Sequence, residues 1–166
     1  MTWKILNLAI LIVVSLTASA QNLSDLLRKA YSSRDSSDYL FQQARKLIKS
    51  TSDEAEYYFC KAARATDYGV PDSAIHYGQL ASDKFKVVQD TGKLIYVYNN
   101  LSKVYQKKGL YEKAISTLFD GLKLAELRHD DTWIGFLYQN ISLNYHDFED
   151  YEKGVKQAKK FALFCS

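Results

Sequence analysis

The chain has 166 residues, 25% of them charged, and its formal net charge of +3 at pH 7 comes from interspersed positive and negative side chains. Because nucleic-acid binding needs a basic face, this charge pattern does not favour a nucleic-acid partner for this segment. One proline, seven glycines and thirteen tyrosines favour a helical core that is rich in aromatic residues. The length predicts a single domain that buries roughly two thirds of its unfolded surface.

The first twenty residues have the pattern of an export signal. Lys4 precedes an apolar run over residues 5–16, and residues 18–20 read Ala-Ser-Ala, which fits a cleavage site. A membrane span needs about 20 apolar residues, so the shorter run favours a cleaved signal over an uncleaved membrane anchor. We therefore expect residues 1–20 to be removed and the protein to be periplasmic or extracellular, with the anchor as the alternative.

The N-terminal half shows four segments with apolar residues at helical spacing. They predict helices over residues 22–33, 38–49, 52–68 and 72–89. Thr51 and Glu54 fit a capping box at the start of the third helix. Gly69 and Pro71 mark the end of that helix and the start of the next.

A repeat organises the rest of the chain. Residues 98–113 recur forty residues later as residues 138–153, and the identical pairs are Tyr98 and Tyr138, Asn100 and Asn140, Ser102 and Ser142, Tyr105 and Tyr145, Tyr111 and Tyr151, Glu112 and Glu152, and Lys113 and Lys153. The same step back from Ala114 and Ile115 reaches Ala74 and Ile75. Self-similarity at a period between about 20 and 50 residues is typical of stacked repeats, whose units each need a neighbour to bury their apolar face.

Each repeat unit is predicted to be a pair of helices. Apolar residues keep helical spacing over residues 94–108 and again over 111–128, and Gly109 separates the two stripes. So short a turn joins only antiparallel helices. Between units we expect turns at residues 90–92 and 129–131, with the N-caps at Thr91 and at Asp130 or Asp131.

These residues resemble the tetratricopeptide repeat (TPR) family. The positions that carry the resemblance in one unit are Leu101, Ser102, Tyr105, Gly109, Tyr111, Ala114, Leu118 and Gly121. In the next unit Ile141, Ser142, Tyr145 and Tyr151 fit the pattern, whereas Glu149, Gly154 and Phe161 depart from it. The period of forty exceeds the usual 34 and resembles the lengthened repeats of bacterial signalling and transcription-regulatory proteins.

The resemblance implies an all-α fold, an antiparallel helix-pair solenoid or TPR-like superhelix, with about seven to eight helices after the signal peptide. The expected organisation is a signal peptide (1–20), N-terminal helices of a partial repeat (21–50) and three repeat units (51–90, 91–130 and 131–166).

In this family the first helices of successive units line a concave groove that binds the partner. The resemblance implies partner-facing side chains at Tyr96, Asn99, Asn100, Lys103 and Lys107 in one unit, and at Phe136, Gln139, Asn140 and His146 in the next. Amide side chains offer donors and acceptors to a peptide backbone, and the two lysines suit a carboxylate. In the alternative interpretation, Asn100 and Asn140 hydrogen-bond the adjacent repeat instead.

Residues with reactive or metal-binding side chains are few and dispersed. His76, His129 and His146 lie far apart, and no nucleotide-binding or hydrolase motif is present, so we predict no catalytic residue, metal or cofactor. Cys60 and Cys165 lie roughly two and a half units apart in a solenoid whose units touch only neighbours, so no disulfide between them is expected. A bridge between two chains through Cys165 is the alternative.

The sequence therefore predicts an exported scaffold that binds a protein or peptide and has no catalysis of its own. The alternative is the sensory N-terminal part of a longer signal-transduction protein, either a membrane histidine kinase or a DNA-binding transcriptional regulator. A terminal solenoid helix usually has a polar outer face, whereas the last residues include Phe161, Leu163 and Phe164. Either this last helix docks elsewhere or the sequence continues, and the family resemblance favours continuation. Membrane contact is expected only through the N-terminal segment or through a part beyond Ser166. A pocket that gathered histidines and carboxylates would instead favour an enzyme.

Overall fold

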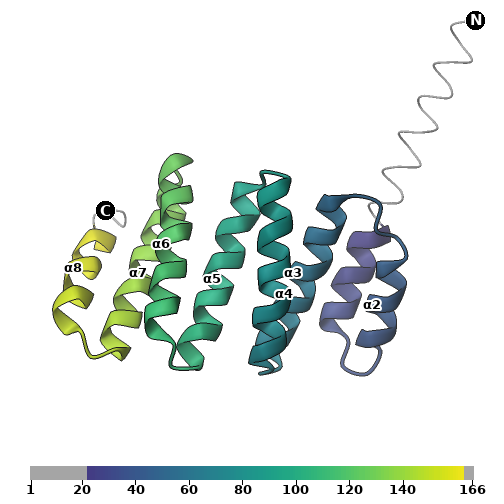
Figure 1. The fold of residues 1–166 in the computed structure, drawn as a ribbon, viewed down its shortest axis with the longest axis horizontal. Helices are drawn as coiled ribbons and strands as arrows, with labels where there is room; N and C mark the ends of the chain where they lie inside the picture. The colour runs from purple at the N-terminus through teal and green to yellow at the C-terminus, as the bar shows by residue number, and fades with distance from the viewer. Residues whose placement is uncertain (1–21, 163–166) are drawn as a thin grey trace, which may run out of the picture.

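The computed structural model describes residues 22–162, and this part of the chain forms eight α-helices and no β-strand. The helices are residues 22–32, α2 (Ser37–Arg45), α3 (Thr51–Asp67), α4 (Pro71–Val87), α5 (Thr91–Lys107), α6 (Tyr111–Leu127), α7 (Asp131–Asp147) and α8 (Tyr151–Ala162). They follow one another in a row, from the N-terminal helix in purple to α8 in yellow (Figure 1). The predicted all-α helix-pair solenoid is confirmed.

The helices are evenly spaced along the chain. From α3 to α8 each helix begins 20 residues after the previous one, and α3 to α7 have 17 residues each. The closest packing is within the pairs α3 and α4, α5 and α6, and α7 and α8. Equivalent positions in successive pairs are therefore 40 residues apart.

Five turns between these helices share one backbone conformation. The second residue after each helix end is left-handed, with φ between 53° and 72°, at Gly69, Gln89, Gly109, His129 and Glu149. In each turn the following backbone N–H donates to a carbonyl five residues earlier, as Val70 does to Ala65 at 2.8 Å and Leu110 does to Tyr105 at 2.9 Å. This is the Schellman motif, which satisfies carbonyls that a helix end leaves without partners.

In α4 to α7 the residue after the left-handed position is the N-cap of the helix. Two of the predicted caps were wrong. Asp90, not Thr91, caps α5, and its carboxylate accepts from the N–H of Lys93 at 3.0 Å. Asp130 caps α7 in the same way, as expected. The capping box of α3 is formed by Ser50 and Asp53 rather than by Thr51 and Glu54.

The second helix ends earlier than predicted. It was expected to reach residue 49, but α2 stops at Arg45. The next backbone N–H groups bond three residues back instead of four, as Leu47 does to Ala44 at 3.0 Å, so the chain tightens and leaves the α-helical path. Pro71 occupies the first turn of α4, as predicted.

The first helices of the pairs form the inner side of the solenoid. α3 contacts α5 and α5 contacts α7, whereas α4, α6 and α8 make no comparable contacts with one another within the described part of the chain. The first helices therefore lie closer together than the second helices. Side chains of α3, α5 and α7 that point away from the second helices share one continuous inner face.

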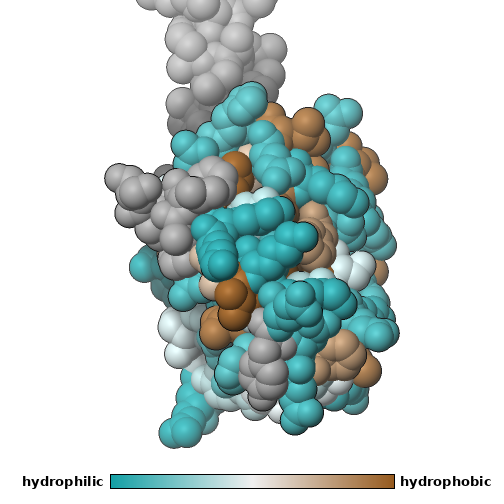
Figure 2. Space-filling view, turned by 90° about the vertical axis from the view of Figure 1, so that its left-hand side faces the viewer, coloured by the Kyte–Doolittle hydropathy of each residue, from teal (hydrophilic) through white to brown (hydrophobic). Residues whose placement is uncertain are grey.

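Buried apolar clusters fill the space between successive helices. One cluster joins α3 to α6 around Phe85 and Leu101, and another joins α5, α6 and α7 around Leu118 and Leu137. The N-terminal helix packs with α2 and α3 around Phe41. Among the coloured residues at the C-terminal end, most side chains are hydrophilic (Figure 2). Exposed residues on α8 include Glu152, Lys153, Val155, Lys156, Lys159 and Lys160.

Replacing Glu149 with glycine is expected to stabilise the protein by about 1 kcal/mol. Glu149 holds the left-handed conformation that costs a residue with a Cβ about 1–2 kcal/mol, and glycine adopts it freely. Urea denaturation followed by circular dichroism measures the change in the free energy of unfolding. The matched control is Lys156→Gly at an exposed position in the middle of α8, which should lose about 1 kcal/mol. Equal destabilisation by both variants would contradict the prediction.

Candidate functional site

The inner face carries two hollows separated along the solenoid. We call the whole surface, formed by residues 22–32, α3, α5 and α7, the inner groove. The type of side chain changes from one helix pair to the next at equivalent positions, which lie 40 residues apart. Asp53, Lys93 and Trp133 are equivalent to one another, and so are Glu56, Tyr96 and Phe136. The groove is therefore charged near its N-terminal end and aromatic near its C-terminal end.

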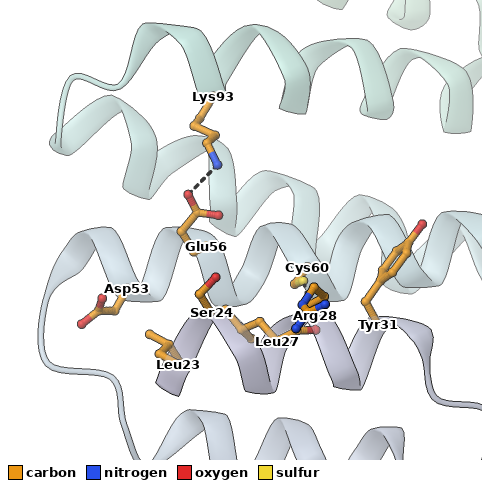
Figure 3. A pocket seen from close by; sticks show the side chains of 9 residues that line it. All are labelled: Leu23, Ser24, Leu27, Arg28, Tyr31, Asp53, Glu56, Cys60 and Lys93. Carbon is orange, nitrogen blue, oxygen red and sulfur yellow. Dashed lines mark hydrogen bonds and ion pairs between the residues drawn. The ribbon is translucent and has the colours of Figure 1, made fainter. Parts of the chain in front are cut away.

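The first hollow lies between the N-terminal helix, α3 and α5 and has a volume of about 450 Å³ (Figure 3). We call it the N-terminal hollow; its lining residues are Leu23, Ser24, Leu27, Arg28, Tyr31, Asp53, Glu56, Cys60 and Lys93. Figure 3 shows the ion pair at its rim, where the Lys93 Nζ lies 2.7 Å from the Glu56 Oε1. This hollow combines an apolar wall with charges of both signs.

Cys60 contributes a half-buried thiol to the N-terminal hollow. Its Sγ donates to the carbonyl of Leu27 at 3.6 Å. Burial, followed by the nearby Glu56 carboxylate, raises the pKa of the Cys60 thiol to about 11, and Lys93 opposes the rise. The thiol is therefore protonated at neutral pH, and such a cysteine is a poor nucleophile. Cys165, the other cysteine, lies outside the described residues.

The second hollow lies between α5 and α7 and has a volume of about 420 Å³. We call it the aromatic hollow; it is lined by Tyr96, Asn99, Lys103, Thr132, Trp133, Phe136, Gln139 and Asn140. The rings of Tyr96 and Trp133 meet edge to face, with centroids 4.5 Å apart and planes at 76°. The ring centroid of Phe136 lies 6.1 Å from that of Trp133. Tyr96 is 49% exposed and Phe136 is 54% exposed, so these rings present apolar surface to an incoming molecule.

Two amides join the helices beneath the aromatic rings. The Asn140 Nδ2 on α7 donates to the Asn99 Oδ1 on α5 at 2.7 Å, and Asn99 is only 9% exposed. Asn140 therefore makes a hydrogen bond to the adjacent repeat, which was the alternative to partner contact in the sequence analysis. An amide side chain has two donors and one acceptor oxygen, so this bond leaves donors on both residues and the Asn140 oxygen for other partners.

Lys103 is the one charged side chain that lines the aromatic hollow. It is exposed and has no hydrogen bond or ion pair with any residue that the structure describes. None of the residues that line this hollow is acidic. The aromatic hollow is therefore positively charged, in contrast to the N-terminal hollow.

Six of the nine predicted partner-facing residues surround the aromatic hollow, and three lie elsewhere. Asn100 is half-buried and lines a cavity of about 10 Å³ between α3, α4 and α5. Lys107 lines a separate hollow of about 160 Å³ at the α3–α4 turn. His146 is exposed near the end of α7, with its Nδ1 3.4 Å from the Asp147 Oδ1.

Sequence reasoning missed two residues of the aromatic hollow, Thr132 and Trp133. The repeat contained a usable signal for Trp133, because it stands forty residues after Lys93 and one helical turn before Phe136. Thr132 had no comparable signal. It joins the hollow only because the start of α7 lies beside α5.

Within residues 22–162, no group of three or more His, Cys, Asp or Glu side chains is arranged to hold a metal ion. No helix in this part of the chain is long and apolar enough to cross a membrane. The predicted signal segment, residues 1–20, lies outside the described part.

Comparisons with known proteins identify the fold. No family model matches the chain, and no curated protein matches it. Among solved structures, the TPR domain of Arabidopsis FLU is similar, with a TM-score of 0.65 and 18% sequence identity over 69% of this chain and 96% of that one. At this identity the likeness concerns the fold alone. The helix pairs, their regular turns and this structural match together show that the chain is a TPR-like helical solenoid.

Proposed function

We propose that this protein is a scaffold that binds a protein or peptide segment in its inner groove and has no catalytic activity of its own. The observation that carries the proposal is the aromatic hollow between α5 and α7. It combines half-exposed rings, amides with spare donors and a lysine that no described residue pairs. Exposed apolar surface rimmed by polar groups is typical of protein-interaction sites.

The hollow suits an extended peptide in particular. A peptide backbone presents carbonyl and N–H groups at regular intervals, and Asn99, Gln139 and Asn140 supply amide donors and acceptors along one wall. The rings of Tyr96 and Phe136 cover apolar side chains of the partner. Because the inner groove continues toward the N-terminal hollow, one extended segment can contact both hollows.

We also propose export, on the basis of the signal pattern in residues 1–20. The spacing of 40 residues between equivalent positions supports the proposed likeness to the lengthened repeats of bacterial signalling proteins. The sensory part of a longer signal-transduction protein remains the second candidate, and its partner would occupy the same groove. Intact mass from soluble and membrane fractions of the native cells distinguishes a free-standing exported chain from part of a larger membrane protein.

Reversing the charge of Lys103 is expected to weaken peptide binding at least about tenfold, because a charge-assisted hydrogen bond contributes about 1.5–3 kcal/mol. The protein is screened against an array of peptides with acidic residues at varied positions, and the retained peptides are titrated by fluorescence anisotropy. Lys107→Glu is the matched control. Lys107 is also exposed and lies one helical turn further along α5, but it lines a different hollow.

The control variant should change the affinity by no more than about twofold, since exposed charges outside the contact act weakly. Both variants should unfold at the same urea concentration as the original protein. Equal loss of affinity in the two variants would contradict the prediction that Lys103 contacts the peptide. If the array retained no peptide, the proposed function itself would be wrong.

A further inference from the structure

The aromatic hollow differs from the rest of the inner groove in its ring geometry. Tyr96 and Trp133 stand nearly perpendicular and form a corner, and Phe136 extends the apolar surface beside it. Grooves lined by such rigid rings are the surfaces on which polyproline II helices dock, because each proline presents a flat apolar ring in a conformation that is already fixed. The N-terminal hollow has no such corner, because Tyr31 is the one aromatic residue among those that line it.

The polar groups of the hollow favour a ligand that offers acceptors. The side chains of Trp133 and Lys103 are donors only, and the indole N–H of Trp133 has no hydrogen-bond partner within the described chain. The Tyr96 hydroxyl and the Gln139 amide are likewise without partners there. A prolyl residue has a carbonyl oxygen but no backbone N–H. A proline-rich backbone therefore suits this hollow, whose unpaired donors outnumber its unpaired acceptors.

The charge of the hollow adds a second requirement. Lys103 lies on α5 two helical turns after Tyr96, on the same side of the helix, and no carboxylate lines the hollow. A partner with a carboxylate next to its apolar segment complements this charge, whereas a basic partner would be repelled. At the N-terminal hollow Lys93 already pairs with Glu56, so this lysine does not need a carboxylate from the partner.

Building on the proposed function, we propose that the partner is a proline-rich segment in the polyproline II conformation, with an acidic residue beside its prolines. The prolines pack on Tyr96, Trp133 and Phe136, and the Trp133 indole and the Tyr96 hydroxyl donate to prolyl carbonyls. Lys103 receives the acidic side chain. This assignment names the class of peptide and the part of the groove that selects it.

The test uses two short fluorescein-labelled peptides of equal length and charge. The first is made of prolines around one glutamate, and the second has alanine in place of every proline. Fluorescence anisotropy should show the proline peptide binding at least about tenfold more tightly, because it loses less conformational freedom and stacks on the rings. Tyr96→Ala and Trp133→Phe should each weaken the proline peptide about fivefold or more.

Tyr39→Ala serves as the matched control, because Tyr39 is an exposed tyrosine on α2, far along the solenoid from the hollow. It should leave the affinity unchanged. Trp133→Phe keeps an aromatic ring but removes the indole N–H, and it guards against loss of fold through a larger truncation. Each variant is checked by thermal melting before titration.

The outcomes separate this inference from the proposed function. If the alanine peptide bound as tightly as the proline peptide, or if only array peptides without proline bound, the polyproline assignment would be wrong while peptide binding in the groove would stand. If neither the two peptides nor the array gave binding, both proposals would fail. Loss of binding in Tyr39→Ala as well would place the proline site outside the aromatic hollow and overturn the inference.

Discussion

Replacing Leu118 with alanine is expected to lower the free energy of unfolding by about 3–5 kcal/mol. The Leu118 side chain is 0% exposed and belongs to the cluster that joins α6 to Ile134 and Leu137 on α7. Removing buried methyl groups loses their transfer free energy and leaves a cavity that close-packed neighbours fill only in part. The loss falls on the boundary between two helix pairs, so the coupling between repeats should weaken as well.

Urea denaturation followed by circular dichroism measures this effect, and Leu127→Ala is the control. Leu127 lies on the same helix but is 79% exposed, so its truncation should change stability by less than about 0.5 kcal/mol. Because stability in a solenoid is nearly a sum over units and interfaces, Leu118→Ala should also broaden the transition. Similar stability in both variants would show that α6 and α7 do not pack as described.

Alanine at Gly78 and alanine at Gly121 are expected to change stability in opposite directions. Both glycines lie inside helices, where alanine is favoured by about 1 kcal/mol. A Cβ at Gly78 would lie 2.6 Å from the Cδ2 of Leu101, whereas one at Gly121 would meet Tyr98 and Leu137 at 3.5 and 3.6 Å, which is ordinary contact.

Leu101 is buried in the core, and its Cγ would also lie only 3.0 Å from the added Cβ, so its side chain must shift and overpacking at Gly78 costs about 1–3 kcal/mol. We expect Gly78→Ala to be destabilised by about 1 kcal/mol and Gly121→Ala to be stabilised by about 1 kcal/mol. Ala81, which occupies the position equivalent to Gly121 one unit earlier, is fully buried and shows that a methyl group fits there. Thermal melting of the two variants measures these changes. A shift of the melting temperature in the same direction in both variants would refute the packing argument.

The repeat in the sequence was sufficient to predict the helix-pair solenoid. Apolar spacing and Gly69 placed the helix predicted over residues 52–68, which the structure has as Thr51–Asp67. Local signals of this kind work because helix formation and left-handed turns depend on neighbouring residues. The cap at α5 was predicted one residue late, because Gln89 takes the left-handed conformation that sets the start of the helix and no local signal distinguishes it from other polar residues.

The candidate site was harder to predict from the sequence than the helices were, because it depends on contacts between repeats. Family resemblance implied that Tyr96, Asn99 and Lys103 face the partner, and in the structure these three residues line one hollow with residues of α7. No sequence pattern showed that Asn140 would bond Asn99, or that Trp133 would stand edge to face with Tyr96. Those contacts depend on the distance and angle between two helices that the sequence separates by forty residues. The sequence by itself determined the helices and their order; the packing of one pair on the next decided which side chains meet, because packing sums many weak contacts across the whole interface.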